Sequence, residues 1–155
     1  MGYYRGSEVM IVRFITVMSH VFALVVLSLE KVYCLESALR AKRFKTDTAY
    51  RSDYITQETW FDFLLGLSYL CAGAELLSLW AGNALVHPGF GLVSSVFNAL
   101  GTLVVLWFAM EAWRADAYIW VFVIFSAFTG GVSFIHNADH LFFKSTIVRR
   151  LDIRI

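Results

Sequence analysis

Three side chains near the end of the sequence have the spacing of metal ligands. His136, Asp139 and His140 follow one another at i, i+3 and i+4, which places them on one face of a helix. Imidazole nitrogens and a carboxylate in this arrangement can hold a metal ion, and His20 or His87 could supply a further ligand. The three residues also follow the last apolar run of the chain, where polar side chains leave a membrane. We favour this second interpretation and expect neither a metal ion nor another cofactor.

A second charged group lies between two long apolar runs, in the stretch FAMEAWRADAYIWVF (residues 108–122). Its tip carries Glu111, Arg114 and Asp116 but no histidine, serine or cysteine, so it lacks the base and nucleophile of a catalytic site. Water and lipid headgroups can solvate these charges. We therefore expect an interfacial turn, anchored by Glu111 and by three amphipathic rings of the kind found at membrane surfaces, Trp113, Tyr118 and Trp120.

The elements that carry these groups are predicted from composition and hydropathy. Of the 155 residues, 59% are hydrophobic and only 16% are charged, which is typical of a membrane-embedded chain. The net charge of +1 gives no attraction to nucleic acid, and no motif indicates a small-molecule substrate. Four apolar runs have the length that crosses a bilayer. We predict an all-α, integral membrane four-helix bundle that forms a single domain over residues 1–155, with spans at about 10–29, 61–80, 90–110 and 117–136.

Two flanking indoles mark the ends of the second run. Trp60 and Trp80 are twenty residues apart, which at about 1.5 Å per residue gives roughly 30 Å, the thickness of a bilayer core. Both are expected to anchor this helix at the membrane surfaces. Near the start of the first run, Arg13 is expected to extend its side chain to the surface.

The connections between the runs differ in length. Residues 81–89 contain the only proline and predict a tight turn, so the helices on either side are antiparallel neighbours. Residues 30–59 are predicted as a charged loop, although their LESALRAKRFK stretch contains helix formers that could extend the first helix or lie along the headgroups.

One carboxyl group lies deep in the second run. Glu75 comes about ten residues before the middle of the turn and Asn98 about thirteen after it, so the two lie at similar depth. A charged side chain at a helix centre costs about 2.5–3.5 kcal/mol, and such groups face protein. We predict that Glu75 forms a hydrogen bond near Asn98 or Ser95 and fixes the register of this helix pair. A proton or ion pathway is the rival interpretation, which usually requires several aligned carboxylates.

Small residues and cysteines complete the set of candidate packing positions. Gly130 and Gly131 in the fourth run favour close contact with a neighbouring helix or a kink. Cys34 and Cys71 have no CxxC or zinc-site spacing and are expected to be free thiols.

Several stretches resemble the four-span membrane proteins related to transmembrane protein 107 of the ciliary transition zone. They are RFITVMSH (13–20), AELLSLWAG (74–82), LVSSVF (92–97) and, most extensively, WFAMEAWRADAYIWVFVIFSAF (107–128). The resemblance rests on the order and spacing of these stretches. The basic stretch 40–51 and the HNADH segment (136–140) depart from the family pattern.

The resemblance implies a non-enzymatic component of the membrane gate at the base of the cilium, with both termini in the cytosol. Its expected partners are the lipid bilayer and Meckel-syndrome-type membrane and scaffold proteins, and its expected role is to support cilium assembly and control ciliary membrane protein composition. Small size and the missing chemistry fit a second class equally, an accessory membrane subunit of a large complex such as a respiratory complex.

Overall fold

The computed structural model describes residues 2–40, 47–80, 88–111, 113, 117–135 and 138. Within them the chain is helical, with turn or irregular backbone only at single positions and no strand. The elements are α1 (Gly2–Leu29), α2 (Lys31–Arg40), α3 (Asp47–Trp80), α5 (Pro88–Met110), α6 (Tyr118–Val121) and the π-helical segment η2 (Phe122–Ala127), after which the helix continues to residue 135. The predicted all-α membrane bundle is confirmed.

Four helices in the described part of the chain are long and apolar enough to cross a membrane. They are Ser7–Leu29, Asp47–Trp80, Gly89–Met110 and Tyr118–Ile135. Pro88 is the first residue of α5. The N–H groups of a first helical turn have no partner within the helix, so the N–H that proline lacks costs no helical hydrogen bond.

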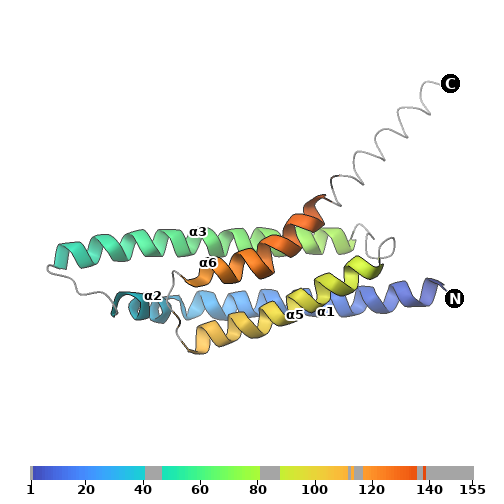
Figure 1. Ribbon diagram of the computed structural model, residues 1–155, viewed down its shortest axis with the longest axis horizontal. Helices are drawn as coiled ribbons and strands as arrows, with labels where there is room; N and C mark the ends of the chain where they lie inside the picture. The colour runs from blue at the N-terminus through green and yellow to red at the C-terminus, as the bar shows by residue number, and fades with distance from the viewer. Residues whose placement is uncertain are drawn as a thin grey trace, which may run out of the picture.

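The four long helices alternate in direction along the chain. α1 and α5 run the same way, and α3 and the α6–η2 helix run the opposite way (Figure 1). α1 and α5 approach closely where Gly91 meets Val9, since a Cβ atom built on Gly91 would lie 2.8 Å from Cγ1 of Val9. A glycine at this crossing lets the two backbones come together.

The buried side chains of α1 recur at the spacing of a helix-bundle seam. Arg13, Val17, His20, Leu24 and Leu27 are all buried and are three or four residues apart. The interior that they face has two halves. The half at the Leu24 and Leu27 end is an apolar cluster, and the half at the Arg13 and His20 end is polar.

The apolar half brings together side chains from every element. Its centre contains Leu24, Leu27, Leu35, Phe61, Val105 and Phe108, which are at most 1% exposed. Because lipid is as apolar as these side chains, dispersion contacts and close packing stabilise this half more than exclusion of water does.

The prediction of a charged loop over residues 30–59 is wrong for the residues that the structure describes. α2 follows α1 after a bend at Glu30, and α3 begins at Asp47, thirteen residues before Trp60. At about 1.5 Å per residue, the 34 residues of α3 span about 51 Å, which exceeds a bilayer core of about 30 Å. Its first turns therefore extend beyond the bilayer core, past the end of α2 (Figure 1).

Lys31 ties the start of α2 to this extension of α3. Its ammonium group lies 3.0 Å from a carboxylate oxygen of Glu58 and 3.0 Å from one of Asp62. Burial lowers the pKa of Lys31, but the hydrogen bonds to Glu58 and Asp62 outweigh burial and the net pKa is raised. Asp62 is thus also paired. These contacts explain why a charged stretch forms helices, because the charge on α2 pairs with opposite charges on α3.

Both cysteines are free thiols, and Cys34 packs inside the apolar half. Burial, with a contribution from Glu30, raises the pKa of the Cys34 thiol to about 11. Since the thiolate is the reactive form, we predict that a water-soluble maleimide modifies Cys34 slowly near neutral pH in the folded protein and rapidly after unfolding. Mass spectrometry of a Cys71→Ala variant measures this rate for Cys34 alone. Equal rates in the folded and unfolded protein would contradict the buried position of α2.

Candidate functional site: a polar half of the bundle interior

Glu75 is the centre of the polar half. Asn98 Nδ2 donates to Glu75 Oε2 at 2.6 Å, and the Ser94 hydroxyl donates to the same oxygen at 2.9 Å. All three side chains are at most 2% exposed. The structure thus brings Glu75 together with Asn98 across α3 and α5.

Ser95 does not take part in this contact. Its hydroxyl donates to the backbone carbonyl of Gly91 at 2.8 Å, within α5. Ser94 and Asn98 are four residues apart and share one helix face, whereas Ser95 is rotated by about 100° from Ser94. Of the two partners that were predicted as alternatives for Glu75, Asn98 forms the hydrogen bond and Ser95 does not; Ser94 is the second donor.

Arg13 is buried in the same half of the interior. It is 0% exposed, and its Nη2 donates to the Ser133 hydroxyl at 3.0 Å. Its guanidinium carbon lies 5.4 Å from the ring centroid of Phe90, a cation–π contact, and its charge interacts with the carboxyl group of Glu75.

The expectation that Arg13 extends to the membrane surface is therefore wrong. α1 begins at Gly2, so Arg13 lies three turns into the helix, on the same face as Val17 and Leu24. A buried arginine needs an opposite charge and hydrogen-bond partners. The Ser133 hydroxyl accepts a hydrogen bond from Nη2 and Glu75 contributes an opposite charge, while Nε has no hydrogen-bond partner among the described residues.

His20 makes a second contact between α1 and the last helix. Its Nε2 lies 3.3 Å from the Ser126 hydroxyl. His20 is seven residues after Arg13, and Ser126 is seven residues before Ser133. The two contacts are thus one heptad apart on each of two antiparallel helices. Hydrogen bonds at both positions fix the register of α1 against the last helix.

The His20 and Ser126 pair has the residue types of a base and a nucleophile. A catalytic pair needs a third group that orients the histidine and a path for substrate. His20 Nδ1 has no hydrogen-bond partner among the described residues, and the two side chains are 2% and 4% exposed. The arrangement therefore supports a hydrogen bond between helices and not acyl transfer.

The polar half connects all four long helices. Arg13 and Ser133 link α1 to the last helix, and Glu75 with Asn98 links α3 to α5. The carboxyl group of Glu75 also acts electrostatically on Arg13, although no ion pair within 4 Å joins these two described side chains. Chemically, the site is a set of interhelical hydrogen bonds that contains two side chains of opposite charge.

The two glycines of the last helix have different surroundings. A Cβ atom on Gly130 would lie 2.4 Å from Cβ and 2.8 Å from Cα of Cys71, so the last helix meets α3 backbone to backbone there. A Cβ atom on Gly131 would meet nothing within 4 Å. Gly130 makes a close helix contact, and Gly131, expected to share it, faces outward because consecutive helical residues are about 100° apart.

Gly130 and Gly131 form a matched pair for mutation. We predict that Gly130→Ala destabilises the protein by about 1–3 kcal/mol, because the added methyl group forces α3 and the last helix apart. Gly131→Ala should be neutral or stabilise by up to about 1 kcal/mol, because alanine favours the helix more than glycine. Unfolding of both variants in mixed micelles measures the difference. Equal stabilities would contradict the backbone contact at Cys71.

Five of the predicted membrane anchors lie on the surface. Trp80 is 90% exposed, and Trp60, Trp120, Trp113 and Glu111 are also exposed. Exposed indoles at the ends of spanning helices suit the boundary between headgroups and hydrocarbon. Their anchoring role remains a prediction.

Tyr118 does not belong to this group. It is 0% exposed, and its hydroxyl lies 2.9 Å from the Ser68 hydroxyl. Its ring packs against Phe61 and Phe108, with centroids 5.1 and 5.6 Å away. Tyr118 begins α6, and the first turn of that helix points it inward, where Ser68 satisfies the hydroxyl. The prediction of an anchor at Tyr118 is wrong.

Some of the predicted chemistry falls on parts of the chain that the structure does not describe. His136, Asp139 and His140 lie outside the described residues, as do Arg114 and Asp116. Among the residues that are described, no three His, Cys, Asp or Glu side chains group closely enough to hold a metal ion.

Sequence reasoning missed the hydrogen bonds between α1 and the last helix, which are made by Arg13, His20, Ser126 and Ser133. It also missed Ser94 of α5 as a partner of Glu75. A signal was present, because the spacing of three and four residues from Arg13 through Val17 and His20 to Leu24 marks one helix face. Choosing the partner helix required the register of helices far apart in sequence.

The fold and the site together define a multi-pass, all-α membrane protein with polar cross-links inside its helix bundle. A comparison with protein families matches residues 9–136, most of the chain, to the family described as TMEM107, transmembrane protein. The chain belongs to the TMEM107 family. Searches of the curated proteins and of the solved structures gave no significant match.

Proposed function

We propose that this protein is a non-enzymatic membrane component of the ciliary transition-zone gate, which supports cilium assembly and controls ciliary membrane protein composition. The observation that carries the proposal is membership of the TMEM107 family over residues 9–136. In this proposal its partners are the surrounding lipid and Meckel-syndrome-type membrane and scaffold proteins.

The arrangement of polar and apolar side chains supports a role in lateral assembly. Hydrogen-bonding groups such as Glu75 and Arg13 lie inside the bundle, whereas Leu103 and Phe134 face outward and are 65% and 67% exposed. A bundle whose outer faces are apolar within the membrane contacts partner helices and lipid sideways, by shape and dispersion. The interior contacts keep those faces in fixed positions.

Beyond the bilayer core, the first turns of α3 and α2 form a second surface. Lys31, Glu58 and Asp62 hold these helices together, and Tyr33 and Ile55 are exposed beside them. In the proposed assembly, this helical hairpin contacts scaffold subunits at the membrane surface.

Localisation of a fluorescent fusion in ciliated cells tests the proposal. The expected result is concentration at the base of the cilium, with co-purification of transition-zone membrane and scaffold proteins, and loss of specific ciliary membrane proteins when the chain is deleted. Gly131→Ala should restore the deleted cells as well as the unmodified chain. Concentration in mitochondrial cristae would instead identify an accessory subunit of a respiratory complex and overturn the proposal.

A further inference from the structure

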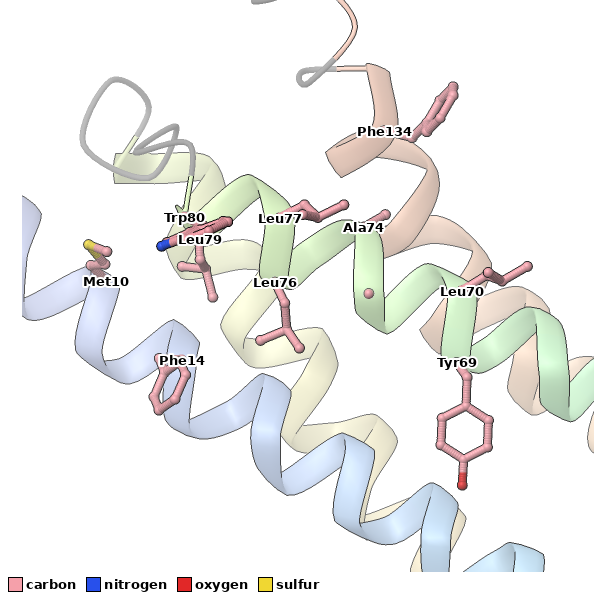
Figure 2. A pocket seen from close by; sticks show the side chains of 11 residues that line it. Met10, Phe14, Tyr69, Leu70, Ala74, Leu76, Leu77, Leu79, Trp80 and Phe134 are labelled. Carbon is pink, nitrogen blue, oxygen red and sulfur yellow. The ribbon is translucent and has the colours of Figure 1, made fainter.

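An apolar groove runs along α3 between α1 and the last helix. Its volume is about 960 Å³, and its lining includes Met10 and Phe14 of α1 and Phe134 of the last helix. Figure 2 shows Trp80 and Met10 at one end of the groove and Tyr69 and Leu70 at the other. No ionisable side chain other than the phenol of Tyr69 lines it, and that hydroxyl is bonded to Ser28 at 2.9 Å.

The length of the groove matches one leaflet of a bilayer. Tyr69 and Trp80 are eleven residues apart on α3, which at about 1.5 Å per residue is about 16 Å. Half of a hydrocarbon core of about 30 Å is about 15 Å. The groove therefore extends from the membrane surface at Trp80 to the bilayer midplane near Tyr69.

The two ends of the groove differ in polarity, as do the ester end and the methyl end of a lipid acyl chain. At the surface end, the indole of Trp80 is 90% exposed and carries an N–H donor, and Figure 2 shows its nitrogen on the side of the ring that faces Met10. At the midplane end and along the floor, Leu70, Gly73 and Ala74 offer only hydrocarbon. A donor at the surface end suits an ester carbonyl, and the uneven apolar floor suits a flexible chain.

We propose that this groove binds one acyl chain of a glycerophospholipid from the leaflet at Trp80, with the ester group beside the indole. The groove opens to the lipid-facing surface, so a chain enters it sideways from the bilayer. Because the walls of the groove surround a bound chain more closely than neighbouring lipids do, dispersion contacts hold the chain and it exchanges more slowly than bulk lipid. This inference stands on the groove alone and does not depend on the proposed ciliary role.

Two glycines on α3 provide a test and its control. A Cβ atom on either Gly73 or Gly66 would meet nothing within 4 Å, so a side chain can start at both positions without a clash at Cβ. Gly73 lines the groove and Gly66 lies outside it. Gly73→Phe fills the groove, and Gly66→Phe adds the same side chain elsewhere on the helix.

The experiment uses the full chain in phosphatidylcholine nanodiscs with photoactivatable phosphatidylcholine. A diazirine near the ester should label the peptides around Met10 and Trp80, and a diazirine near the chain end those around Tyr69. Gly73→Phe should reduce this labelling by about tenfold, the equivalent of about 1.4 kcal/mol, and Gly66→Phe should leave it unchanged. If Gly73→Phe does not fold, Leu77→Trp narrows the groove from its rim and should reduce labelling in the same way.

Three outcomes would overturn the proposal. Equal labelling of the two folded phenylalanine variants would show contact with bulk lipid only. Labelling of the groove by a photoactivatable sterol, with none by phosphatidylcholine, would assign a different lipid. Loss of phosphatidylcholine labelling on addition of a partner membrane protein, with cross-links to its helix at Gly73, would assign the groove to protein.

Discussion

Glu75→Leu should destabilise the protein by about 3–5 kcal/mol, because it removes a buried acceptor of two hydrogen bonds and the opposite charge nearest to a buried arginine. The substitution leaves the Asn98 amide and the Ser94 hydroxyl without their acceptor. It also leaves the buried guanidinium of Arg13 without an opposite charge. Unfolding in mixed micelles and the yield of assembled protein in membranes both measure the loss.

Two further variants separate the causes. Glu75→Gln keeps an oxygen acceptor for Asn98 and removes only the charge, so its loss should lie between those of the unmodified protein and Glu75→Leu. Phe63→Leu changes an exposed position of the same helix and should have little effect. A normally abundant, fully assembled Glu75→Leu variant would remove the packing role. If that variant also lost proton or ion movement in vesicles, the rival pathway would gain support.

Arg13→Leu should cause a loss of similar size, about 3–5 kcal/mol. The change removes the 3.0 Å hydrogen bond to Ser133 and the contact with Phe90, and it leaves Glu75 without an opposite charge. Arg13→Lys keeps the charge but not the planar guanidinium, and its loss should be smaller. Stability of the variants in mixed micelles gives the comparison, and an unchanged Arg13→Leu variant would contradict the buried position of this side chain.

The double variant measures whether the two charges act together. Arg13→Leu combined with Glu75→Leu leaves no buried charge, so its loss should be smaller than the sum of the single losses by more than about 1 kcal/mol. Additive losses would show that Arg13 and Glu75 stabilise the bundle independently. The unmodified protein, the two single variants and the double variant form one cycle and are measured under one condition.

Hydropathy and depth along the chain were enough to predict the spans and one of the interior contacts. Long apolar runs predicted the membrane-spanning helices, since few other structures can bury a run of that length. The turn predicted at residues 81–89 implied that the helices on either side are antiparallel, and counting residues from it placed Glu75 and Asn98 at one depth. Residues 81–87 themselves lie outside the described part of the chain. That contact depends on position along the helix axes.

The remaining contacts depend on rotation about the helix axes, which counting does not provide. Ser94 and Ser95 lie at nearly the same depth, and only the orientation of α5 decides that Ser94 meets Glu75. The inward position of Tyr118 likewise depends on the rotation of α6 about its axis. The π-helical segment adds one residue to the helix and so changes which later side chains of the last helix face inward.

The prediction that Arg13 reaches the membrane surface was wrong for a different physical reason. Arg13 lies near the start of the first apolar run, which predicted a position at the membrane surface. The helix α1 begins at Gly2, however, and continues through Arg13. An arginine is stable at that depth only with the charge of Glu75 nearby, and Glu75 is 62 residues away in sequence. The burial of a charged side chain can therefore be predicted from sequence only when the oppositely charged side chain near it is identified as well.

The central claim is that four helices cross the membrane with polar side chains turned inward and the tip near Glu111 outside. Labelling of single-cysteine variants in sealed vesicles by a membrane-impermeant maleimide tests it, in a background of Cys34→Ser and Cys71→Ala. Glu111→Cys should react from one side of the vesicle, whereas Leu70→Cys and Leu100→Cys, exposed to lipid at mid-span, should not react. Labelling at mid-span as fast as at Glu111→Cys, or protection of Glu111→Cys from both sides, would contradict the account.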